Sequence, residues 1–395
     1  MCPLFKTERM KEYVTIEEVH QAYKDCRRHK GSTEGFVKYQ MDFLSNNYRL
    51  YQELNTMTYE IGRSKAFCVT RPKVREVFCA QFRDRIVHHL LANKFLPILE
   101  AEMIDDAYAC RKGKGTEYCI ERVRKHIERV SMDYTKEAWV LKCDLRGFFM
   151  SINRHLIYRI LEDAIRKRYD GDDVEWWLWL WRKVVLHAPE NNCVRVGDLS
   201  LWDKLPRNKS LFTSGGKGLP IGNLPSQILA NLLLSAFDKW IIGRIGKDGG
   251  YGRYVDDFVA VSRDKALLLE LLQDAGCWLL VNLGLTLHPR KISLQEAMKG
   301  VRFIGVMIRP HRQTTNPRTL GSLHEVVSEW NYLRNPSNAE AARFIRRFNS
   351  YFGIICHRNS YGERVRAWKM AKHKDKFYCL NMCCLKIRQK QRNYE

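Results

Sequence analysis

The chain has 395 residues, 45% of them hydrophobic, and is long enough for two or three domains with a large core. Its formal net charge of +23 at pH 7 indicates a polyanionic partner, nucleic acid first, although a basic protein that merely avoids self-association has the same balance. The thirteen cysteines lack the paired spacing of a zinc site and indicate reduced thiols in a cytosolic protein.

The N-terminal part of the chain predicts helices. Residues 1–6 lack the apolar core of a signal peptide, and the apolar stretches of the chain are too short, or too interrupted by charge, to span a bilayer. Residues 15–60 carry helical periodicity, with Thr15 as the candidate N-cap of the first helix.

Because residues 1–6 lack a signal-peptide core and no stretch is expected to span a bilayer, we expect a cytoplasmic protein with no membrane partner.

Strand patterns begin after residue 60. The segments 66–70 and 74–78 are strand-like, and a helical pattern follows over 84–96. Strand and helix patterns then alternate through residue 310. This order predicts an α+β domain.

One predicted strand ends at a carboxylate. Residues 139–144 form an apolar run that finishes at Asp144, and two aromatic residues, Phe148 and Phe149, follow after a turn. The pattern places Asp144 at the end of a strand, where its side chain can contribute to a site.

Residues 169–215 have the character of an insertion. Four tryptophans crowd its first part: Trp176, Trp177, Trp179 and Trp181. A packed aromatic cluster is the simpler interpretation, and base stacking is the alternative. The later stretch 203–210 is turn-like and basic.

Two adjacent carboxylates lie between two strand patterns in the stretch 251–261. Asp256 and Asp257 stand at the tip of the β-hairpin that this stretch predicts. Because like charges repel at close range, a neutralising cation is expected, and Mg²⁺ takes hard oxygen ligands of this kind. A plain acidic turn is the alternative.

Asp144 and this acidic pair are far apart in sequence, so they meet only through the tertiary fold. Two metal ions roughly 4 Å apart, held by such acids, are the standard means of in-line nucleotidyl transfer. The strand that ends at Asp144 and the acidic hairpin together indicate this chemistry more specifically than either does alone.

The last part of the chain, 320–395, predicts helices and a basic surface. Phe344, Phe348 and Phe352 fall four residues apart with arginines among them, which predicts an amphipathic helix with a cationic side. The tail over 366–395 is rich in Lys and Arg and indicates a surface that binds the phosphates of a nucleic acid, with a solvated charged end as the alternative.

These motifs, in this order, resemble those of reverse transcriptases. The palm motifs of that family are similar to Asp144 with Gly-Phe-Phe at 147–149, Tyr-Val-Asp-Asp at 254–257, Leu-His-Pro-Arg-Lys at 287–291 and Phe-Ile-Gly at 303–305. The fingers motifs of bacterial and intron-type members resemble 73–75, 84–87 and 108–116. The resemblance covers about residues 60–310 and implies a right-hand polymerase fold, with fingers and palm of antiparallel sheet plus helices and a helical thumb.

The resemblance also implies an order of regions along the chain. They are an N-terminal helical extension (1–60), fingers (61–135), a palm (136–310) with an insertion at about 169–215 and some interleaved fingers elements, and a helical thumb with a basic tail (311–395). Little room then remains for an RNase H, maturase or endonuclease domain.

One segment narrows the resemblance. Most reverse transcriptases have a Gln-Gly stretch that ends in Ser-Pro, whereas this chain has Ile221-Gly222 and ends in Ser-Gln at Gln227. This form, with 202–206 and 209–212, is similar to the enzymes of diversity-generating retroelements, a group II intron-like prokaryotic type. It implies error-prone cDNA synthesis from a template-repeat RNA, with errors mainly at adenines, to diversify a target gene.

The resemblance assigns the metal chemistry to the acids. Asp144 and Asp256 would coordinate two Mg²⁺ ions, with Mn²⁺ as a substitute, the Leu145 carbonyl as a further ligand and Asp257 in support. One ion would lower the pKa of the primer 3′-hydroxyl and the other would neutralise the leaving pyrophosphate. Lys291 matches a lysine that protonates the pyrophosphate, and a mobile surface lysine is the alternative.

Other positions would contact the incoming nucleotide. Lys73 and Arg75 would hold its triphosphate, with a surface charged pair as the alternative, and the planar Arg75 side chain suits the base as well. Phe149 matches the residue that blocks a ribose 2′-hydroxyl, which implies dNTP substrates. Phe148 and Phe149 as simple core residues are the alternative.

Ile221, in one segment with Gly222 and Gln227, is the main departure from related polymerases. The matching glutamine in those enzymes hydrogen-bonds near the sugar of the nascent pair, and isoleucine can neither donate nor accept a hydrogen bond. Each ~1.4 kcal/mol of lost discrimination gives about tenfold more errors. The residue chemistry therefore predicts low fidelity but gives no reason for a preference for adenine.

The implied partners are template RNA, primer and cDNA, dNTPs, and an accessory variability protein, a small basic oligomer. In this family the template RNA itself can supply the primer. The alternatives are another prokaryotic reverse transcriptase of the retron, intron or defence type, a catalytically idle RNA-binding scaffold, and an RNA-dependent RNA polymerase. Ile221 with Gln227 argues against the first, and the three acids argue against the second.

Overall fold

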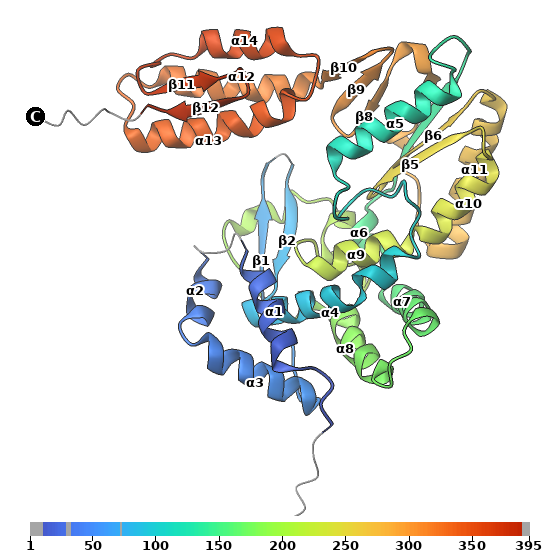
Figure 1. Cartoon of the computed structure of the whole chain (residues 1–395), viewed down its shortest axis with the longest axis vertical. Helices are drawn as coiled ribbons and strands as arrows, with labels where there is room; N and C mark the ends of the chain where they lie inside the picture. The colour runs from blue at the N-terminus through green and yellow to red at the C-terminus, as the bar shows by residue number, and fades with distance from the viewer. Residues whose placement is uncertain (1–10, 29–32, 72, 389–395) are drawn as a thin grey trace, which may run out of the picture. The chain divides into compact units, whose positions relative to one another are not determined.

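The computed structural model describes residues 11–28, 33–71 and 73–388 (Figure 1). The chain divides into two compact units, and the polypeptide passes between them several times. Unit 1 consists of Met1–Cys110, Asp144–Arg244 and Leu271–Arg290, and unit 2 of Arg111–Cys143, Ile245–Glu270 and Lys291–Glu395. The segment 1–6 and the end of the basic tail, 389–395, lie outside the described residues.

Helices begin unit 1, as the periodicity predicted. They are α1 (Ile16–Arg27), α2 (Glu34–Gln40), α3 (Phe43–Asn55) and, after the first strands, α4 (Phe82–Glu100). Thr15 caps α1: its hydroxyl accepts a hydrogen bond from the Glu18 backbone N–H at 3.2 Å, and the Glu18 carboxylate accepts one from the Thr15 N–H at 3.0 Å. The predicted N-cap is confirmed, and α1 packs against α4.

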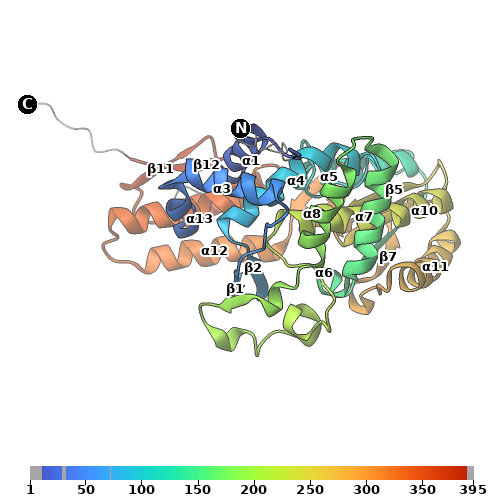
Figure 2. The ribbon, with the colours of Figure 1, turned by 90° about the horizontal axis from the view of Figure 1, so that it is seen from below.

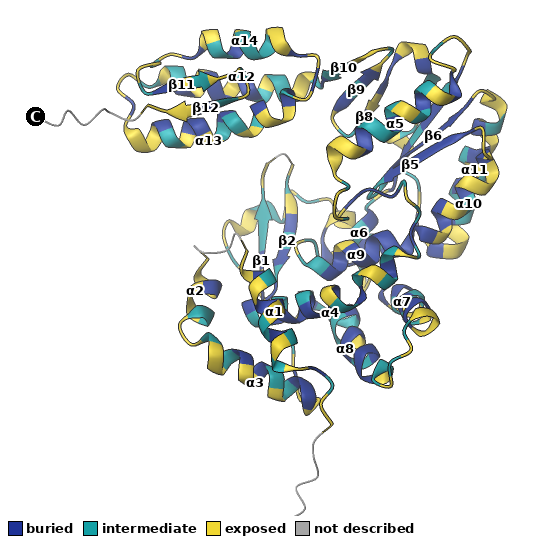
Figure 3. Cartoon of the chain, in the orientation of Figure 1, coloured by how far each residue is buried: buried dark blue, intermediate teal, exposed yellow. Residues whose placement is uncertain are grey.

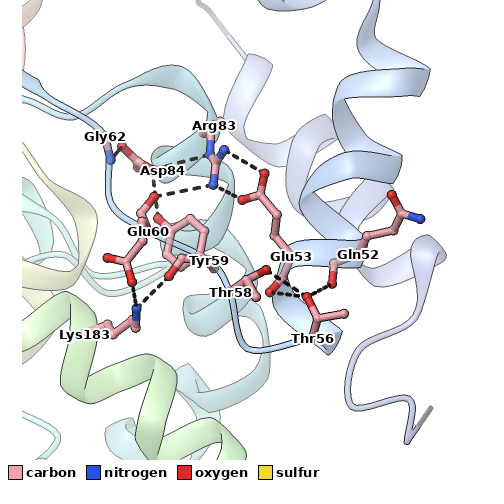
Figure 4. Close-up of polar contacts among 10 residues, drawn as sticks. All are labelled: Gln52, Glu53, Thr56, Thr58, Tyr59, Glu60, Gly62, Arg83, Asp84 and Lys183. Atoms are coloured by element: carbon pink, nitrogen blue, oxygen red, sulfur yellow. Dashed lines mark hydrogen bonds and ion pairs between the residues drawn. The ribbon is translucent and has the colours of Figure 1, made fainter.

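A polar cluster joins α3 to the start of α4 (Figure 4). Asp84 is fully buried and accepts hydrogen bonds from the Tyr59 hydroxyl at 2.8 Å and the Gly62 backbone N–H at 3.1 Å. Arg83 forms a two-point ion pair with Glu53 on α3. Burial raises the pKa of Asp84, although the Tyr59 hydrogen bond and Arg83 oppose the rise. The cluster fixes the N-terminal helices on the helix that carries the 84–87 motif.

A three-stranded sheet of unit 1 has the order β2-β1-β4. β1 (Ser64–Val69) and β2 (Arg75–Cys79) form an antiparallel hairpin, close to the two predicted strands. β4 (Cys193–Arg195) pairs with β1 in parallel. The segment 169–215 therefore returns to this sheet and does not form a module of its own.

The tryptophan-rich segment forms α8 (Val174–Leu186), which packs against α7 (Arg154–Arg168). Three of its tryptophans are buried: Trp176, Trp177 and Trp181. Trp176 Nε1 donates a hydrogen bond to the Leu54 carbonyl at 3.2 Å, and the other two rings meet Phe95 edge-on. These side chains are core residues, in agreement with the simpler interpretation.

The other helices between residues 148 and 299 are α6 (Phe148–Ser151), α9 (Leu224–Leu233), α10 (Ser235–Ile245), α11 (Lys265–Leu283) and the 3₁₀ helices η1 (Pro189–Asn191), η2 (Leu199–Leu201), η3 (Arg207–Lys209), η4 (Leu211–Thr213), η5 (Pro289–Lys291) and η6 (Ala297–Lys299). α11 is long and apolar enough to cross a membrane by length and composition alone, so the expectation that no stretch meets that test is wrong for this helix. Leu268, Leu271 and Leu279 on α11 are buried, whereas Leu269, Leu280 and Val281 are exposed, and 28% of the apolar window is buried inside the protein.

The main sheet of unit 2 has four strands in the order β5-β6-β3-β7. They are β3 (Trp139–Asp144), β5 (Gly250–Tyr254), β6 (Asp257–Ser262) and β7 (Ser293–Glu296). β5 and β6 form an antiparallel hairpin, and β3 is antiparallel to β7. Most of β5 and β6 is buried (Figure 3), and α5 (Thr116–Val130) packs on them. The predicted strand at Asp144 and the predicted acidic hairpin are both confirmed.

The C-terminal part of unit 2 combines helices with short strands. Its elements are β8 (Val301–Phe303), β9 (Val306–Arg309), β10 (Arg312–Thr315), α12 (Pro317–Tyr332), α13 (Asn338–Ile355), α14 (Tyr361–Met370), β11 (Phe377–Leu380) and β12 (Cys384–Ile387). α12 and α13 lie side by side (Figures 1 and 2). Between them Trp330 stacks on Phe344, with ring centroids 4.6 Å apart. α13 is the predicted amphipathic helix: its phenylalanines are buried, and Arg343 and Arg346 are exposed.

The expectation of a mostly helical segment over 320–395 missed the β11–β12 hairpin. Phe377 and Leu385 on its two strands are buried in the same core as α12 and α13. Each strand is only four residues long, too short for a reliable period-two pattern. The cysteines of the described residues are free thiols, as expected, and the mixture of helices with antiparallel sheets confirms the α+β class.

Candidate active site

The acidic hairpin has a two-residue turn. Tyr254 pairs with Asp257, so Val255 and Asp256 form the turn itself. Val255 has a φ of 58°, in the left-handed region that a β-branched residue rarely adopts. Its carbonyl accepts a hydrogen bond from Nη1 of the buried Arg253 at 3.0 Å. A buried arginine thus holds a strained turn, and strain of this kind concentrates at functional sites.

The strand that ends at Asp144 lies beside this turn. β3 is the sheet neighbour of β6, and Lys142 Nζ on β3 lies 3.5 Å from Asp257 Oδ1. Because alternate residues of a strand face the same side, Lys142 and Asp144 share one face of β3. Asp144 is buried, whereas Asp256 and Asp257 are half-buried. The sheet therefore places the two predicted acidic motifs on adjacent strands.

The residues after Asp144 are fixed by the segment 286–291. The Asp144 carbonyl accepts a hydrogen bond from the His288 N–H at 2.8 Å, and the buried Leu145 forms a β-bridge with Leu287. Lys291 is exposed at the end of η5. Metal ligation by the Leu145 carbonyl and proton donation by Lys291 stay predictions.

No group of three or more His, Cys, Asp or Glu side chains among the described residues is arranged to hold a metal ion. The carboxylates of Asp144, Asp256 and Asp257 are nevertheless hard oxygen donors of the kind that Mg²⁺ takes. The ion pair with Lys142 shows that Asp257 already attracts a cation. The donor chemistry of these carboxylates therefore fits Mg²⁺, and metal ligation by Asp144, Asp256 and Asp257 stays a prediction.

A basic pocket of about 410 Å³ adjoins β3 in unit 2. Three cationic side chains, those of Lys142, Arg302 and Arg309, line it together with part of the 303–305 motif. None of its lining residues, all within the described part of the chain, is acidic. Since Lys142 also contacts Asp257, the pocket adjoins the acidic hairpin, and its charge suits phosphate groups.

Lys73 and Arg75 lie at the β1–β2 hairpin of unit 1. Both side chains are exposed, and Arg75 pairs with Val69 across the hairpin. The contact of these two cations with a triphosphate stays a prediction.

Ile221 lies in an apolar setting. Its half-buried side chain packs against a cluster formed by Ala66, Phe78, Met150 and Leu211. Its carbonyl accepts a hydrogen bond from the Phe78 N–H at 2.8 Å. The surroundings of Ile221 therefore suit an apolar side chain, and a glutamine here would bring an amide against hydrocarbon.

Three further predicted residues are also in unit 1. Gly222 has a φ of 115°, and a Cβ there would lie 2.7 Å from the Phe78 carbonyl oxygen, so glycine is required. Phe149 is half-buried with its ring 5.5 Å from that of Phe148, and Gln227 is exposed on α9. Phe149 thus has both a packing partner and an exposed side, which leaves the two interpretations of this residue open.

Glu76 organises this region through buried hydrogen bonds, and the sequence patterns did not single it out. It is fully buried on β2, and its carboxylate accepts hydrogen bonds from Trp202 Nε1, Ser210 Oγ and the Leu211 N–H, each at 2.7 Å. These bonds fasten the segment 202–211 to the strand that supports Ile221. The available signal was the strand register, because Glu76 lies two residues before Phe78 and therefore shares the buried face of β2, where a charge is tolerated only with partners.

Sequence comparison identifies the family. Residues 65–308, more than half of the chain, match the family described as Reverse transcriptase (RNA-dependent DNA polymerase). Protein YkfC of Escherichia coli (strain K12) is 22% identical over 264 residues, which cover 59% of this chain and 62% of that protein. The chain thus spans about three fifths of the length of this relative.

Solved structures with a similar arrangement include telomerases. Apo telomerase from Candida tropicalis has a TM-score of 0.49 at 11% identity, over 78% of this chain and 57% of that chain. Telomerase from Candida albicans with a fragment of telomeric RNA has a TM-score of 0.46 at 11% identity, over 80% and 56%. The chain spans little more than half of either structure. On the match over 65–308, the chain belongs to the reverse transcriptase (RNA-dependent DNA polymerase) family.

Proposed function

We propose that this protein is an RNA-directed DNA polymerase. The observation that carries the proposal is the position of β3, which ends at Asp144, beside the hairpin with Asp256 and Asp257 in a chain of the reverse transcriptase family. Asp144 and Asp256 hold two Mg²⁺ ions, with the Leu145 carbonyl and Asp257 in support. When bound, the ions lower the pKa of the primer 3′-hydroxyl and neutralise the leaving pyrophosphate.

The remaining predicted residues orient the substrate. Lys73 and Arg75 hold the triphosphate through charge-assisted hydrogen bonds. Phe149 excludes a ribose 2′-hydroxyl, so that dNTPs are preferred, and Lys291 gives a proton to the pyrophosphate. Each role is the one that the matching motif position implies.

The basic pocket beside β3 holds phosphates of the primer strand. Lys142, Arg302 and Arg309 line it, and it adjoins the acidic hairpin where a primer end must lie. The net charge of +23 supports binding of template and primer elsewhere on the surface. The partners are therefore RNA template, primer and growing cDNA.

The narrower proposal is a cytoplasmic enzyme of a diversity-generating retroelement. It copies a template-repeat RNA with errors at adenines and works with a small basic oligomeric accessory protein. Ile221 with Gln227 supports this assignment, and the apolar packing of Ile221 supports weak discrimination, since its side chain offers no hydrogen bond to a nucleotide.

Primer extension on a defined RNA template tests the polymerase function. We expect dNTP incorporation by the wild type, none by Asp256→Ala, and wild-type extension by Asp248→Ala, which removes an exposed carboxylate of the same unit. Equal use of rNTPs would favour an RNA polymerase, and RNA binding without extension would favour an idle scaffold. Sequenced cDNA tests the narrower assignment: errors spread evenly over all template bases would favour another prokaryotic reverse transcriptase.

A further inference from the structure

The loop between α13 and α14 reaches helix α5 within unit 2. Arg358 in this loop has a side chain that is only 3% exposed. It forms a two-point ion pair with Glu117 in the first turn of α5, with Nη2–Oε1 and Nη1–Oε2 distances of 2.7 and 2.5 Å. Glu117 therefore supplies the negative charge that a buried arginine requires.

The same loop is fastened to β10. The Asn359 N–H donates to the Gln313 carbonyl at 2.9 Å, and the Asn359 side-chain oxygen accepts from the Gln313 N–H at 2.9 Å. The Ser360 and Thr315 hydroxyls lie 3.4 Å apart. These contacts, with that of Arg358, join the C-terminal core, defined as α12–α14 with β11 and β12, to β10 and α5.

Polar groups line the junction between the C-terminal core and the elements α5 and β10. A pocket of about 380 Å³ lies there, lined only by charged and polar residues, among them Glu117, Arg124, Arg312 and Arg358. The C-terminal core, by contrast, closes on itself around aromatic side chains such as Phe348. Apolar burial therefore holds the core together, while directional polar contacts hold it on α5 and β10.

The position of the core matters because α13 presents cations. Arg343 and Arg346 are exposed on this helix, and such side chains bind the phosphates of a nucleic acid. The Glu117–Arg358 ion pair is one of the polar contacts that set the position of these cations.

We propose that the Glu117–Arg358 ion pair is a latch that positions the C-terminal core so that the enzyme retains its primer–template duplex between nucleotide additions. The inference rests on the proposed polymerase function. Glu117 is a positioning residue, and its loss shortens the run of nucleotides added per binding event without slowing the addition of one nucleotide. Neutralising Glu117 leaves the buried Arg358 charge without its acid, which drives the loop toward solvent.

The test compares Glu117→Gln with a matched variant, Glu121→Gln. Glu121 lies one turn further along α5, lines the same pocket and pairs with Arg124 of its own helix at 2.6 Å, so its loss leaves the junction intact. Run length is measured with excess heparin to trap released enzyme, and single-nucleotide incorporation is measured separately. We expect Glu117→Gln to shorten the mean run at least threefold, with the single-nucleotide rate within twofold of wild type, and Glu121→Gln to match wild type.

Hydrogen exchange without nucleic acid gives a readout that does not depend on activity. We expect Glu117→Gln, but not Glu121→Gln, to speed amide exchange over 357–360 at least tenfold. Arg358→Lys keeps the charge, loses the two-point geometry and should give an intermediate result, which keeps the test available if the first variant folds poorly. Equal run lengths in wild type and Glu117→Gln, or unchanged exchange, overturn the latch.

Two further outcomes separate the latch from the polymerase function. A single-nucleotide rate that falls as far as the run length overturns the latch, because Glu117 would then act on the chemical step. If the wild type extends no primer, the polymerase proposal fails, and the exchange measurement alone decides whether Glu117 holds the loop.

Discussion

Lys142 Nζ on β3 lies 3.5 Å from Oδ1 of Asp257 at the start of β6. The two side chains are 22% and 25% exposed, so the lysine offsets part of the negative charge of the acidic hairpin. In a polymerase of the proposed kind, this lysine competes with a divalent ion for the carboxylate of Asp257. On the proposed function, Lys142 would therefore set part of the affinity of the hairpin for Mg²⁺.

Lys142→Met should lower the Mg²⁺ concentration that gives half-maximal extension. A partly exposed ion pair contributes about 1 kcal/mol, so the expected change is about fivefold. The measurement is a Mg²⁺ titration of single-nucleotide extension at saturating primer–template, because Lys142 also lines the basic pocket. Lys265→Met is the control: Lys265 lies 4.1 Å from the centre of the Trp139 ring, at the other end of β3. An unchanged or higher Mg²⁺ requirement for the Lys142 variant would rule out competition.

Ile221→Gln should raise fidelity at template adenines. The amide restores a group that can hydrogen-bond near the nascent pair, and each ~1.4 kcal/mol of regained discrimination lowers errors about tenfold. The substitution also places a polar group against Phe78 and Leu211, at a cost of about 1–3 kcal/mol in the free energy of unfolding. Sequencing of cDNA gives the error spectrum, and denaturant unfolding gives the stability.

Ile221→Val separates these two effects. It loses one methylene from the apolar cluster at a cost of about 1 kcal/mol and adds no hydrogen-bonding group, so its errors should match wild type. If Ile221→Gln leaves the error frequency unchanged at adenines and at other template bases, the side chain at this position has no part in fidelity.

Glu76→Ala should release the segment 202–211 from β2. The change removes the acceptor for Trp202, Ser210 and the Leu211 N–H, and each donor left unpaired inside the protein costs about 1–3 kcal/mol. Faster amide exchange over 202–211 and a shift in tryptophan fluorescence are the expected signs. Asp198→Ala removes an exposed carboxylate that lies just before this segment and accepts a hydrogen bond from the Ser200 backbone N–H, and it should change neither. Equal protection in both variants would mean that packing alone holds the segment.

The positions of the candidate catalytic acids in the fold were predictable because each acid lies in a motif of purely local pattern. Asp144 ends an apolar strand, and Asp256 and Asp257 lie between two strand patterns, so both settings are visible within about ten residues. The family motifs then supplied their order along the chain. The strain at Val255 was not visible, because its φ follows from the closure of the hairpin.

Partner choice across long sequence separations could not be predicted. Glu76 pairs with Trp202, and Arg358 pairs with Glu117, and nothing in the neighbouring residues selects those partners. The choice depends on how distant elements pack, and the residues around each charge do not specify its partner. The β11–β12 hairpin was missed for a related reason, since its strands are stabilised by burial of Phe377 in a core built by α12 and α13.

Glu102 provides a prediction about pH and stability within unit 1. Its carboxylate lies 2.7 Å from Arg168 Nε, 3.1 Å from Lys167 Nζ and 3.4 Å from Lys239 Nζ, which joins the end of α4 to α7 and α10. The Arg168 hydrogen bond, with those of the two lysines, lowers the pKa of Glu102 from 4.5 to about 2, although burial opposes the shift.

The sign of the pH effect follows from this lowered pKa. The unfolded chain takes up a proton near pH 4.5 and the folded protein only near pH 2, so the ion pairs stabilise the fold above about pH 5 and lose that effect as pH falls toward 2. Glu102→Gln should therefore lower the free energy of unfolding by about 1–2 kcal/mol at pH 7. This figure is below the full value of the shift because the three cations are 38–65% exposed and solvent screens them.

Denaturant unfolding of wild type and Glu102→Gln at pH 7, 5 and 3 measures the effect. The difference between the two proteins should be largest at pH 7 and smaller at pH 3, and it should vanish below pH 2, where the wild-type carboxyl is itself mostly protonated. Glu162→Gln is the control. Glu162 pairs with Arg166 one turn further along α7, and such a pair should contribute only a few tenths of a kcal/mol to the free energy of unfolding. A deficit of the same size at pH 7 and pH 3 would show that the Glu102 side chain stabilises unit 1 through packing, since only the charge of its carboxylate depends on pH.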